Sequence, residues 1–226
     1  MRPLLASLPP AVRPLVVTYP AAGGNSYADL LALVRAQLAD VGECHVLGWS
    51  FAGPLALMLA AAEPLKVRGV ILSASFVRAP TPVLPLIRFA LASPPVWMWR
   101  VARRVPLWLF RPPTDEFRRA KSETWQRVPA SAVAARLRAI AGVDARALLE
   151  ACRQPVLYIA SSEDGIVPHR NAEEVCGLRP DIQRVTIEGP HHAMFTNPLA
   201  AARAIDDFIR GHQAVTTLPV YGAASA

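Results

Sequence analysis

The chain has 226 residues, a net charge of +7 and a sequence pI near 10.0. Hydrophobic residues make up 53% of it and charged residues 18%, which excludes a disordered chain and indicates one globular domain with a sizeable core. The three cysteines have no metal-binding spacing, so we expect no disulfide framework, no zinc site and a reducing cytoplasm. Prolines break the apolar opening, and arginines interrupt the best membrane-span candidate at 82–110, so we expect neither a signal peptide nor integral membrane association.

Short apolar runs alternate with helical patterns along the chain. The runs read as buried strands at 15–19, 44–47, 67–72, 156–160 and 184–187. The helical patterns lie at 27–39, where Ser26 can cap the helix, and at 53–62, 131–140, 144–152, 171–176 and 198–210. This alternation predicts an α/β fold with a mostly parallel sheet and helices on both faces.

Residues 76–130 interrupt the alternation with clustered prolines and four of the five tryptophans. Between Pro94 and Lys121 there are seven basic residues and only two acidic ones. We therefore predict a core formed by 1–75 and 151–226, with an inserted helical lid at 76–150. The basic lid favours an anionic partner, such as an acidic carrier protein, a CoA thioester or a membrane surface, over nucleic acid, for which no binding module is present.

The stretch GWSFAG, residues 48–53, places Ser50 between a predicted strand and a predicted helix. A serine at such a junction is either an ordinary turn residue or a nucleophile on a sharp turn. A nucleophilic serine needs a base, usually histidine, and the base needs a carboxylate to orient it. Both partners stand at matching places, because Asp164 and His191 each come four residues after a later predicted strand. Strand ends of a parallel sheet converge at one edge, so these three side chains are expected to meet.

Each of the two partners has a neighbour that could replace it. Glu163 precedes Asp164, and we favour Asp164 because it stands shortly before the apolar-proline pair Val167-Pro168. His192 follows His191, and we favour His191 because it comes directly after a Gly-Pro pair.

These motifs resemble those of the α/β-hydrolase superfamily, and within it the small lidded esterases of the pimeloyl-carrier-protein methyl ester esterase group. The resemblance covers GWSFAGPLALMLAA, the segment DARALLEACRQPVLYIASSEDGIVP and the segment EGPHHAMFTNP. It implies Ser50 as nucleophile, His191 as base, Asp164 as the orienting acid, and no metal or organic cofactor. It further implies that the Phe51 N–H contributes to an oxyanion hole and that Trp49 lines the acyl site, although plain core packing would equally explain Trp49.

The chain departs from the family pattern in two ways. Ala52 replaces the last glycine of G-x-S-x-G, a change of one methyl group that Gly53 helps to accommodate. Only one predicted strand, 15–19, precedes the nucleophile strand, where the family has more. We expect that the earlier strands and their oxyanion loop are missing, with residues 2–14 reading as the end of a helix and a linker. An alternative register makes YPAAGG, 19–24, the oxyanion loop. Missing strands would remove a second oxyanion donor and expose a sheet edge.

The sequence thus predicts a hydrolase that cleaves a carboxylic ester or thioester through an acyl-enzyme. Two rivals remain open at this point. The first is an acyltransferase or cofactor-free haloperoxidase that uses the same triad, and the second is a non-catalytic or truncated protein of the same fold.

Overall fold

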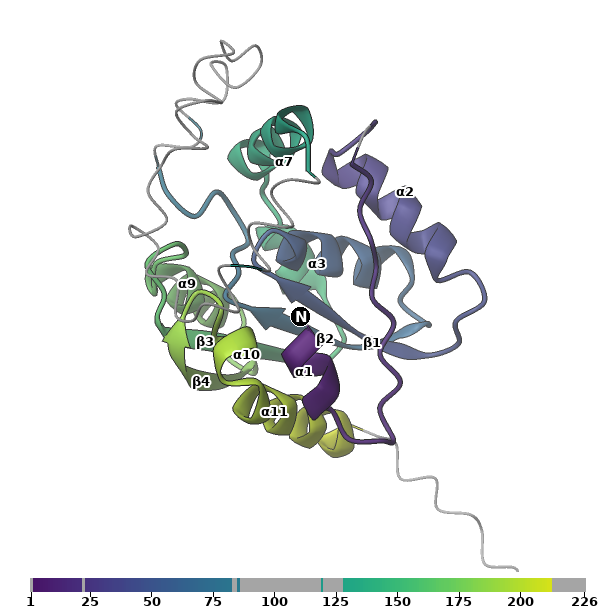
Figure 1. Ribbon diagram of the computed structural model, residues 1–226, viewed down its shortest axis with the longest axis vertical. Coiled ribbons are helices and arrows are strands. Elements are labelled where there is room, and N and C mark those ends of the chain that lie inside the picture. Colours follow the sequence, from purple (N-terminus) through teal and green to yellow (C-terminus); the bar gives the residue numbers. More distant parts are fainter. Residues whose placement is uncertain (1, 22, 83–84, 86–118, 120–127, 213–226) are drawn as a thin grey trace, which may run out of the picture.

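The computed structural model describes residues 2–21, 23–82, 85, 119 and 128–212. Its centre is a sheet of four parallel strands in the order β1-β2-β3-β4 (Figure 1). The strands are β1 (Cys44–Trp49), β2 (Val67–Ser73), β3 (Val156–Glu163) and β4 (Gln183–Pro190). The predicted parallel α/β fold is therefore confirmed, and four of the five predicted strands form.

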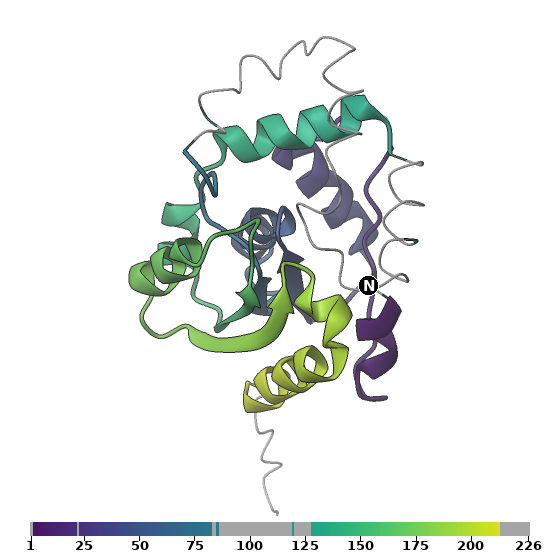
Figure 2. The ribbon, with the colours of Figure 1, turned by 60° about the vertical axis from the view of Figure 1, so that its left-hand side comes forward.

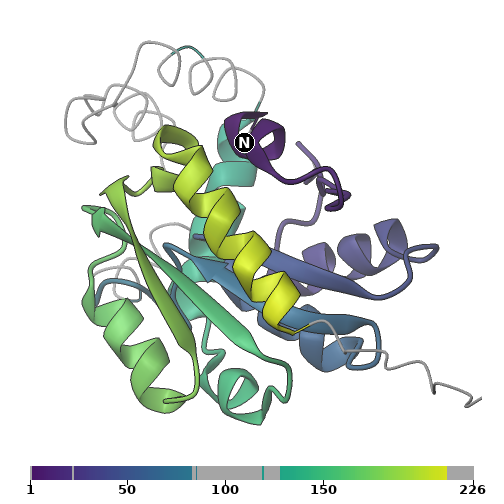
Figure 3. The ribbon, with the colours of Figure 1, turned by 90° about the horizontal axis from the view of Figure 1, so that it is seen from below.

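Helices cover both faces of this sheet, as Figure 3 shows from below. One face carries α3 (Ala52–Ala62), α8 (Arg146–Ala151), α9 (Arg170–Leu178) and, packed outside α3, α2 (Tyr27–Gln37). The other face carries α1 (Arg2–Ser7), α10 (Ala193–Thr196) and α11 (Pro198–Gly211). The remaining described helix, α7 (Ala130–Gly142), lies across the top of the molecule above the start of α2 in Figure 2.

Alternating side chains of the central strands supply the two cores. On β2, Leu72 packs into the core under α3, whereas its neighbour Ile71 packs against α11. On β3, Tyr158 and Ile159 divide in the same way. Each of these side chains is at most 2% exposed, and full burial of such a side chain is worth about 1.5–3 kcal/mol. Both faces of β2 and β3 are therefore anchored, which holds their carboxyl ends in place.

The capping residue predicted for the helix at 27–39 is confirmed. Ser26 caps α2 through a capping box, in which its side chain accepts a hydrogen bond from Asp29 N and Asp29 accepts one from Ser26 N. The opening of the chain forms α1, followed by a turn and an irregular segment; that α1 is the end of a longer helix stays a prediction. The single turn of α10 was not predicted, because four residues are too few to display a period.

The predicted strand at 15–19 is wrong. Residues 12–20 run as an irregular segment beside β1 in Figure 1, and they join no ladder of the sheet. Leu15 and Val16 are 56% and 55% exposed, so the segment is not buried either. A β-branched run becomes a strand only when it shares hydrogen bonds with a neighbouring strand, and this segment forms no ladder with β1 or with any other described strand.

The predicted lid at 76–150 falls mostly outside the described residues, as does most of its basic stretch from Pro94 to Lys121. Its described end comprises α7 and α8, and α8 packs against α3 and α9 of the core. The division into core and lid remains a prediction. Within the described part of the chain, no helix has both the length and the apolar character needed to cross a membrane.

Candidate active site

Ser50 occupies a strained turn between β1 and α3. Its φ of 53° lies in the left-handed region, which costs a non-glycine residue on the order of 1 kcal/mol or more. The flanking glycines allow this turn. A Cβ on Gly48 would lie 2.4 Å from the Ala52 carbonyl oxygen, and one on Gly53 would lie 1.8 Å from Ser75 Oγ. This tight turn, the elbow of residues 48–53, therefore requires glycine at both of its ends.

Hydrogen bonds from neighbouring elements hold the strained turn in place. Ser50 N donates to the Ser73 carbonyl at 2.8 Å, and Ser75 Oγ donates to the Ser50 carbonyl at 2.7 Å. The hydroxyl of Tyr27, on α2, donates to the Phe51 carbonyl at 2.9 Å, and the two rings stack with centroids 4.9 Å apart. The turn is therefore fixed from β2 on one side and from α2 on the other.

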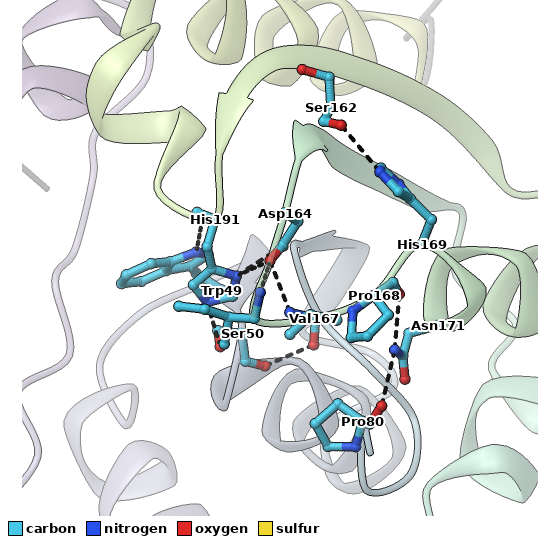
Figure 4. Close-up of polar contacts among 12 residues, drawn as sticks. Trp49, Ser50, Pro80, Ser162, Asp164, Val167, Pro168, His169, Asn171 and His191 are labelled. Atoms are coloured by element: carbon cyan, nitrogen blue, oxygen red, sulfur yellow. Dashed lines mark hydrogen bonds and ion pairs between the residues drawn. The ribbon is translucent and has the colours of Figure 1, made fainter. Parts of the chain in front are cut away.

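Ser50, His191 and Asp164 come together at the carboxyl ends of the strands (Figure 4). His191 Nε2 lies 3.0 Å from Ser50 Oγ, and His191 Nδ1 lies 2.8 Å from Asp164 Oδ2. The imidazole and the carboxylate are both buried, with side chains 6% and 3% exposed. Burial keeps water from competing for these hydrogen bonds, so the imidazole stays aligned between its two partners.

Backbone donors fix the carboxylate of Asp164. Its Oδ1 accepts hydrogen bonds from Ile166 N at 2.9 Å and from Val167 N at 2.8 Å. This turn points the carboxylate at His191 and supplies donors to a buried charge, which would otherwise be costly. The neighbouring Glu163 is exposed and has no contact with His191 among those the structure gives. The geometry thus singles out Asp164 of the two acidic candidates.

The rings of His191 and its neighbour His192 point in different directions. His191 Nε2 faces Ser50, whereas the His192 ring packs edge-on against Trp49 with centroids 5.5 Å apart. Trp49 Nε1 donates to the His191 carbonyl at 3.2 Å, and its ring lies 5.5 Å from the His191 ring. Trp49 therefore holds the backbone of His191 through this hydrogen bond, and its side chain also lines a groove beside Ser50.

A groove of about 1340 Å³ opens beside Ser50. Apolar side chains form most of its lining, and Ser50, Phe51 and His191 lie among its walls. The N–H of Phe51 makes no backbone hydrogen bond to the described residues. It stands at the amino end of α3, where N–H groups are available to a negative charge.

Arg136 of α7 ties the predicted lid to the loop before α2. Its Nε donates to Asn25 Oδ1 at 2.9 Å, one Nη donates to the Pro20 carbonyl at 3.2 Å, and the guanidinium lies over the Tyr19 ring. Burial raises the pKa of Tyr19 and lowers that of Arg136, because both groups lose hydration at the groove wall.

Sequence reasoning missed the residues that support the site without belonging to its motifs. Ser75 and Tyr27 both hold the elbow, yet one reads as a residue after a strand and the other as an ordinary apolar helix position. Ser162 Oγ likewise accepts a hydrogen bond from Gly189 N, which joins the ends of β3 and β4 just before Asp164 and His191. Only a local signal, such as a hydroxyl directly after a strand, could have pointed to Ser75.

A sequence profile described as the alpha/beta hydrolase family matches residues 1–204. The chain belongs to the alpha/beta hydrolase family. Among curated proteins, it is 30% identical over 220 residues to a pimeloyl-[acyl-carrier protein] methyl ester esterase of Neisseria meningitidis, covering 89% of this chain and 85% of the relative. It is also 30% identical over 199 residues to the biotin biosynthesis bifunctional protein BioHC of Cellvibrio japonicus, covering 84% of this chain but only 39% of that protein.

Among solved structures, this chain resembles a hydrolase from Pseudomonas aeruginosa PA01 with a TM-score of 0.69 and 20% identity. The likeness covers 85% of this chain and 74% of the other, so about a quarter of the Pseudomonas chain has no counterpart here. Identity this low bears on the fold alone.

Proposed function

We propose that this alpha/beta hydrolase cleaves a carboxylic ester or thioester through a covalent acyl-enzyme on Ser50. The observation that carries the proposal is the buried line of hydrogen bonds from Ser50 Oγ through His191 to Asp164, with distances of 3.0 and 2.8 Å. Such a line lets a hydroxyl lose its proton as it attacks.

In the proposed reaction, Ser50 Oγ attacks the carbonyl carbon while its proton moves to His191 Nε2. Asp164 remains ionised and stabilises the imidazolium through the Nδ1–H. The negative charge that develops on the carbonyl oxygen is met by the Phe51 N–H at the amino end of α3. His191 then protonates the departing alcohol or thiol, which leaves the acyl group on Ser50. A water molecule, deprotonated by His191, releases the acid and regenerates the serine.

For the natural substrate we propose a small acyl ester or thioester presented on an acidic carrier protein, with Trp49 in the acyl site. Support comes from the net charge of +7, from the apolar groove beside Ser50, and from the printed activity of the Neisseria relative. The basic stretch that would meet a carrier lies outside the described residues.

The test is hydrolysis of p-nitrophenyl butyrate together with labelling by a fluorophosphonate, each on the wild-type chain and on Ser50→Ala. We expect ester turnover and a phosphonyl adduct on Ser50, both lost in the variant while its circular dichroism is unchanged. Equal turnover by the two proteins would refute Ser50 as nucleophile. Absence of both turnover and adduct in folded wild-type chain would favour the non-catalytic rival.

An acyltransferase or a haloperoxidase that used the same triad would be distinguished from a hydrolase by the acceptor or the reagents supplied. Bromination of monochlorodimedone with bromide and peroxide, or transfer of the butyryl group to an added alcohol faster than to water, would move the assignment to those classes. We expect hydrolysis to dominate, because the His191–Ser50 pair lies at the wall of an open groove that water can enter.

A further inference from the structure

The ends of two neighbouring strands turn through the same strained conformation. Ser50 after β1 and Ala74 after β2 are the two non-glycine residues of the described chain whose φ is left-handed, at 53° and 44°. They stand at equivalent positions, because Trp49 pairs with Ser73 in the register of the sheet. A left-handed φ is unfavourable for any residue other than glycine, so it persists only where the surrounding structure holds it. The second strained turn brings Ser75 into contact with the first.

The side chain of Ser75 joins the two turns. Its hydroxyl donates to the Ser50 carbonyl at 2.7 Å, and the same carbonyl accepts a hydrogen bond from Gly53 N at 3.1 Å. Ser75 is completely buried, at 0% exposure, so water does not compete for its hydroxyl. The shorter of the two hydrogen bonds at the Ser50 carbonyl therefore comes from β2, and it fixes the direction in which this carbonyl points.

This hydrogen bond acts on the oxyanion donor through a single peptide group. The Ser50 carbonyl and the Phe51 N–H belong to one planar trans peptide group, in which C=O and N–H point in opposite directions. Because the carbonyl is directed at Ser75, the Phe51 N–H is directed away from it. A donor at the carbonyl oxygen also polarises the amide, since hydrogen bonds in a chain strengthen one another. Ser75 thereby both aims the Phe51 N–H and makes it a stronger donor.

Tyr158 of β3 holds Ser75 from the other side. Its hydroxyl donates to the Ser75 carbonyl at 2.7 Å and accepts a hydrogen bond from Ser75 N at 3.2 Å. The adjacent Ala74 N donates to the Ile159 carbonyl at 2.9 Å. Burial raises the pKa of Tyr158, so its hydroxyl stays protonated and remains a donor. Asp164 follows the same strand, so β3 positions both the acid and Ser75.

We propose that Ser75 is a positioning residue for the oxyanion donor and that Tyr158 keeps Ser75 in place. A hydrogen-bonded path then runs from the Tyr158 hydroxyl through Ser75 to the peptide group between Ser50 and Phe51. The inference rests on the proposed function, because an oxyanion forms only if Ser50 attacks a carbonyl. It extends that function by giving two buried residues outside the triad a role in turnover.

A purely structural role for Ser75 leads to different expectations. A hydrogen bond that only stabilised the turn would change the stability of the protein and leave the reaction of folded molecules as it was. A positioning role acts on the transition state, in which negative charge develops on the substrate oxygen, and much less on the bound ester. Loss of the Ser75 hydroxyl should then lower kcat and leave KM unchanged.

The experiment compares the wild-type chain with Ser75→Ala and Tyr158→Phe in two assays. The first is hydrolysis of p-nitrophenyl butyrate across a range of pH. The second is inhibition by an alkyl trifluoromethyl ketone, to which Ser50 Oγ adds while its proton passes to His191, so that the ketone oxygen becomes the oxyanion. Ser161→Ala is the matched control, because Ser161 is also a buried serine but lies on β3. Circular dichroism and thermal melting of every variant control for folding.

We expect Ser75→Ala to lower kcat by about 10–100-fold with KM changed by less than about twofold, because the Phe51 N–H is misaligned. The inhibition constant of the ketone should rise by a similar factor, since the ketone forms the same oxyanion. Tyr158→Phe should lower kcat in the same way by about three- to tenfold. The pH at which kcat/KM is half-maximal should not move, because His191 keeps its partners. Ser161→Ala should change kcat by less than about twofold.

Several outcomes would overturn the proposal. A loss of kcat in Ser75→Ala no larger than in Ser161→Ala, or a loss carried by KM alone, would leave Ser75 a structural residue. A shifted pH profile would mean that Ser75 acts on the base, and an unchanged inhibition constant for the ketone would mean that it does not act on the oxyanion.

Folding and the proposed function are separated from this inference by the same measurements. If Ser75→Ala does not fold, Tyr158→Phe decides, because it keeps the buried ring, and wild-type kinetics in that variant would refute the path. A folded wild-type chain without ester turnover would overturn the proposed function together with this inference. An active wild-type chain equalled by Ser75→Ala would overturn this inference alone.

Discussion

The two edges of β1 differ in their hydrogen-bond partners. On the inner side and at the carboxyl end, hydrogen bonds from β2, α2 and the β3 and β4 loops hold the Ser50 turn, His191 and Asp164. On the outer side, the backbone of β1 and the segment 12–20 face a groove without strand partners among the described residues. The same residue pattern, a short β-branched run, is a strand at β2 and an irregular segment at 15–19. Whether such a run forms a strand therefore depends on hydrogen bonding to an adjacent strand and not on its composition.

The largest expected effect is on catalysis, when a residue on the hydrogen-bonded side of β1 is replaced. His191→Gln should lower kcat for p-nitrophenyl butyrate by about 10³–10⁴-fold, because the serine loses its proton acceptor. His192→Gln should change kcat less than about tenfold, because its ring packs on Trp49 and does not face Ser50. Circular dichroism and thermal melting of both variants control for folding. A larger loss in His192→Gln would reassign the base.

The next effect concerns the stability of the elbow. Gly53→Ala should lower the free energy of unfolding by about 1–3 kcal/mol, because the new Cβ would lie 1.8 Å from Ser75 Oγ. Gly177→Ala is the matched control on α9, where nothing lies within 4 Å, and should stabilise by about 0.5–1 kcal/mol. Urea unfolding measures both.

The steric cause can be separated from a backbone cause in the same experiment. Gly53→Ala should cost less stability in a Ser75→Ala background than in the wild-type chain, because the nearer of the two clashing atoms, Ser75 Oγ, is absent there; comparison with Ser75→Ala alone accounts for the lost hydrogen bond to the Ser50 carbonyl. An equal cost in the two backgrounds would point to the backbone of the elbow as the cause.

A smaller effect is expected where α2 supports the elbow. Tyr27→Phe removes the hydrogen bond to the Phe51 carbonyl and should cost about 1 kcal/mol of stability, while the ring stacking remains. If the bond also positions the Phe51 N–H, kcat should fall a few-fold with KM unchanged. A change confined to KM would argue that Tyr27 acts on substrate binding instead.

The smallest effect should come from the unpartnered side. Leu15→Ser should change the free energy of unfolding by no more than about 0.5 kcal/mol, because the side chain is already 56% exposed. A cost near that of burying a leucine, about 2 kcal/mol, would show that the segment is buried in solution and would contradict the open groove. Urea unfolding of this variant beside Leu65→Ser, at an 86% exposed position, makes the comparison.

Much of the site could be predicted because its geometry is tied to strand ends. Ser50, Asp164 and His191 each follow a strand that was readable as an apolar run, and parallel strands bring such positions to one edge. The residues that support them could not be read in this way. Ser75 and Tyr27 act through single hydroxyl groups whose partners lie 25 and 24 residues away, and no local pattern encodes that pairing.

The sequence by itself determined the alternation of strands and helices, the parallel sheet and the order of the three candidate catalytic residues, because periodicity and turn residues are local properties. Tertiary structure placed His191, and not His192, within hydrogen-bond distance of Ser50, placed Asp164, and not Glu163, beside His191, and left residues 15–19 outside the sheet. Neighbouring residues differ in where the backbone points them, and a ring or carboxylate finds its partner only after distant loops have met. A strand, likewise, exists only where a second backbone lies beside it to share hydrogen bonds.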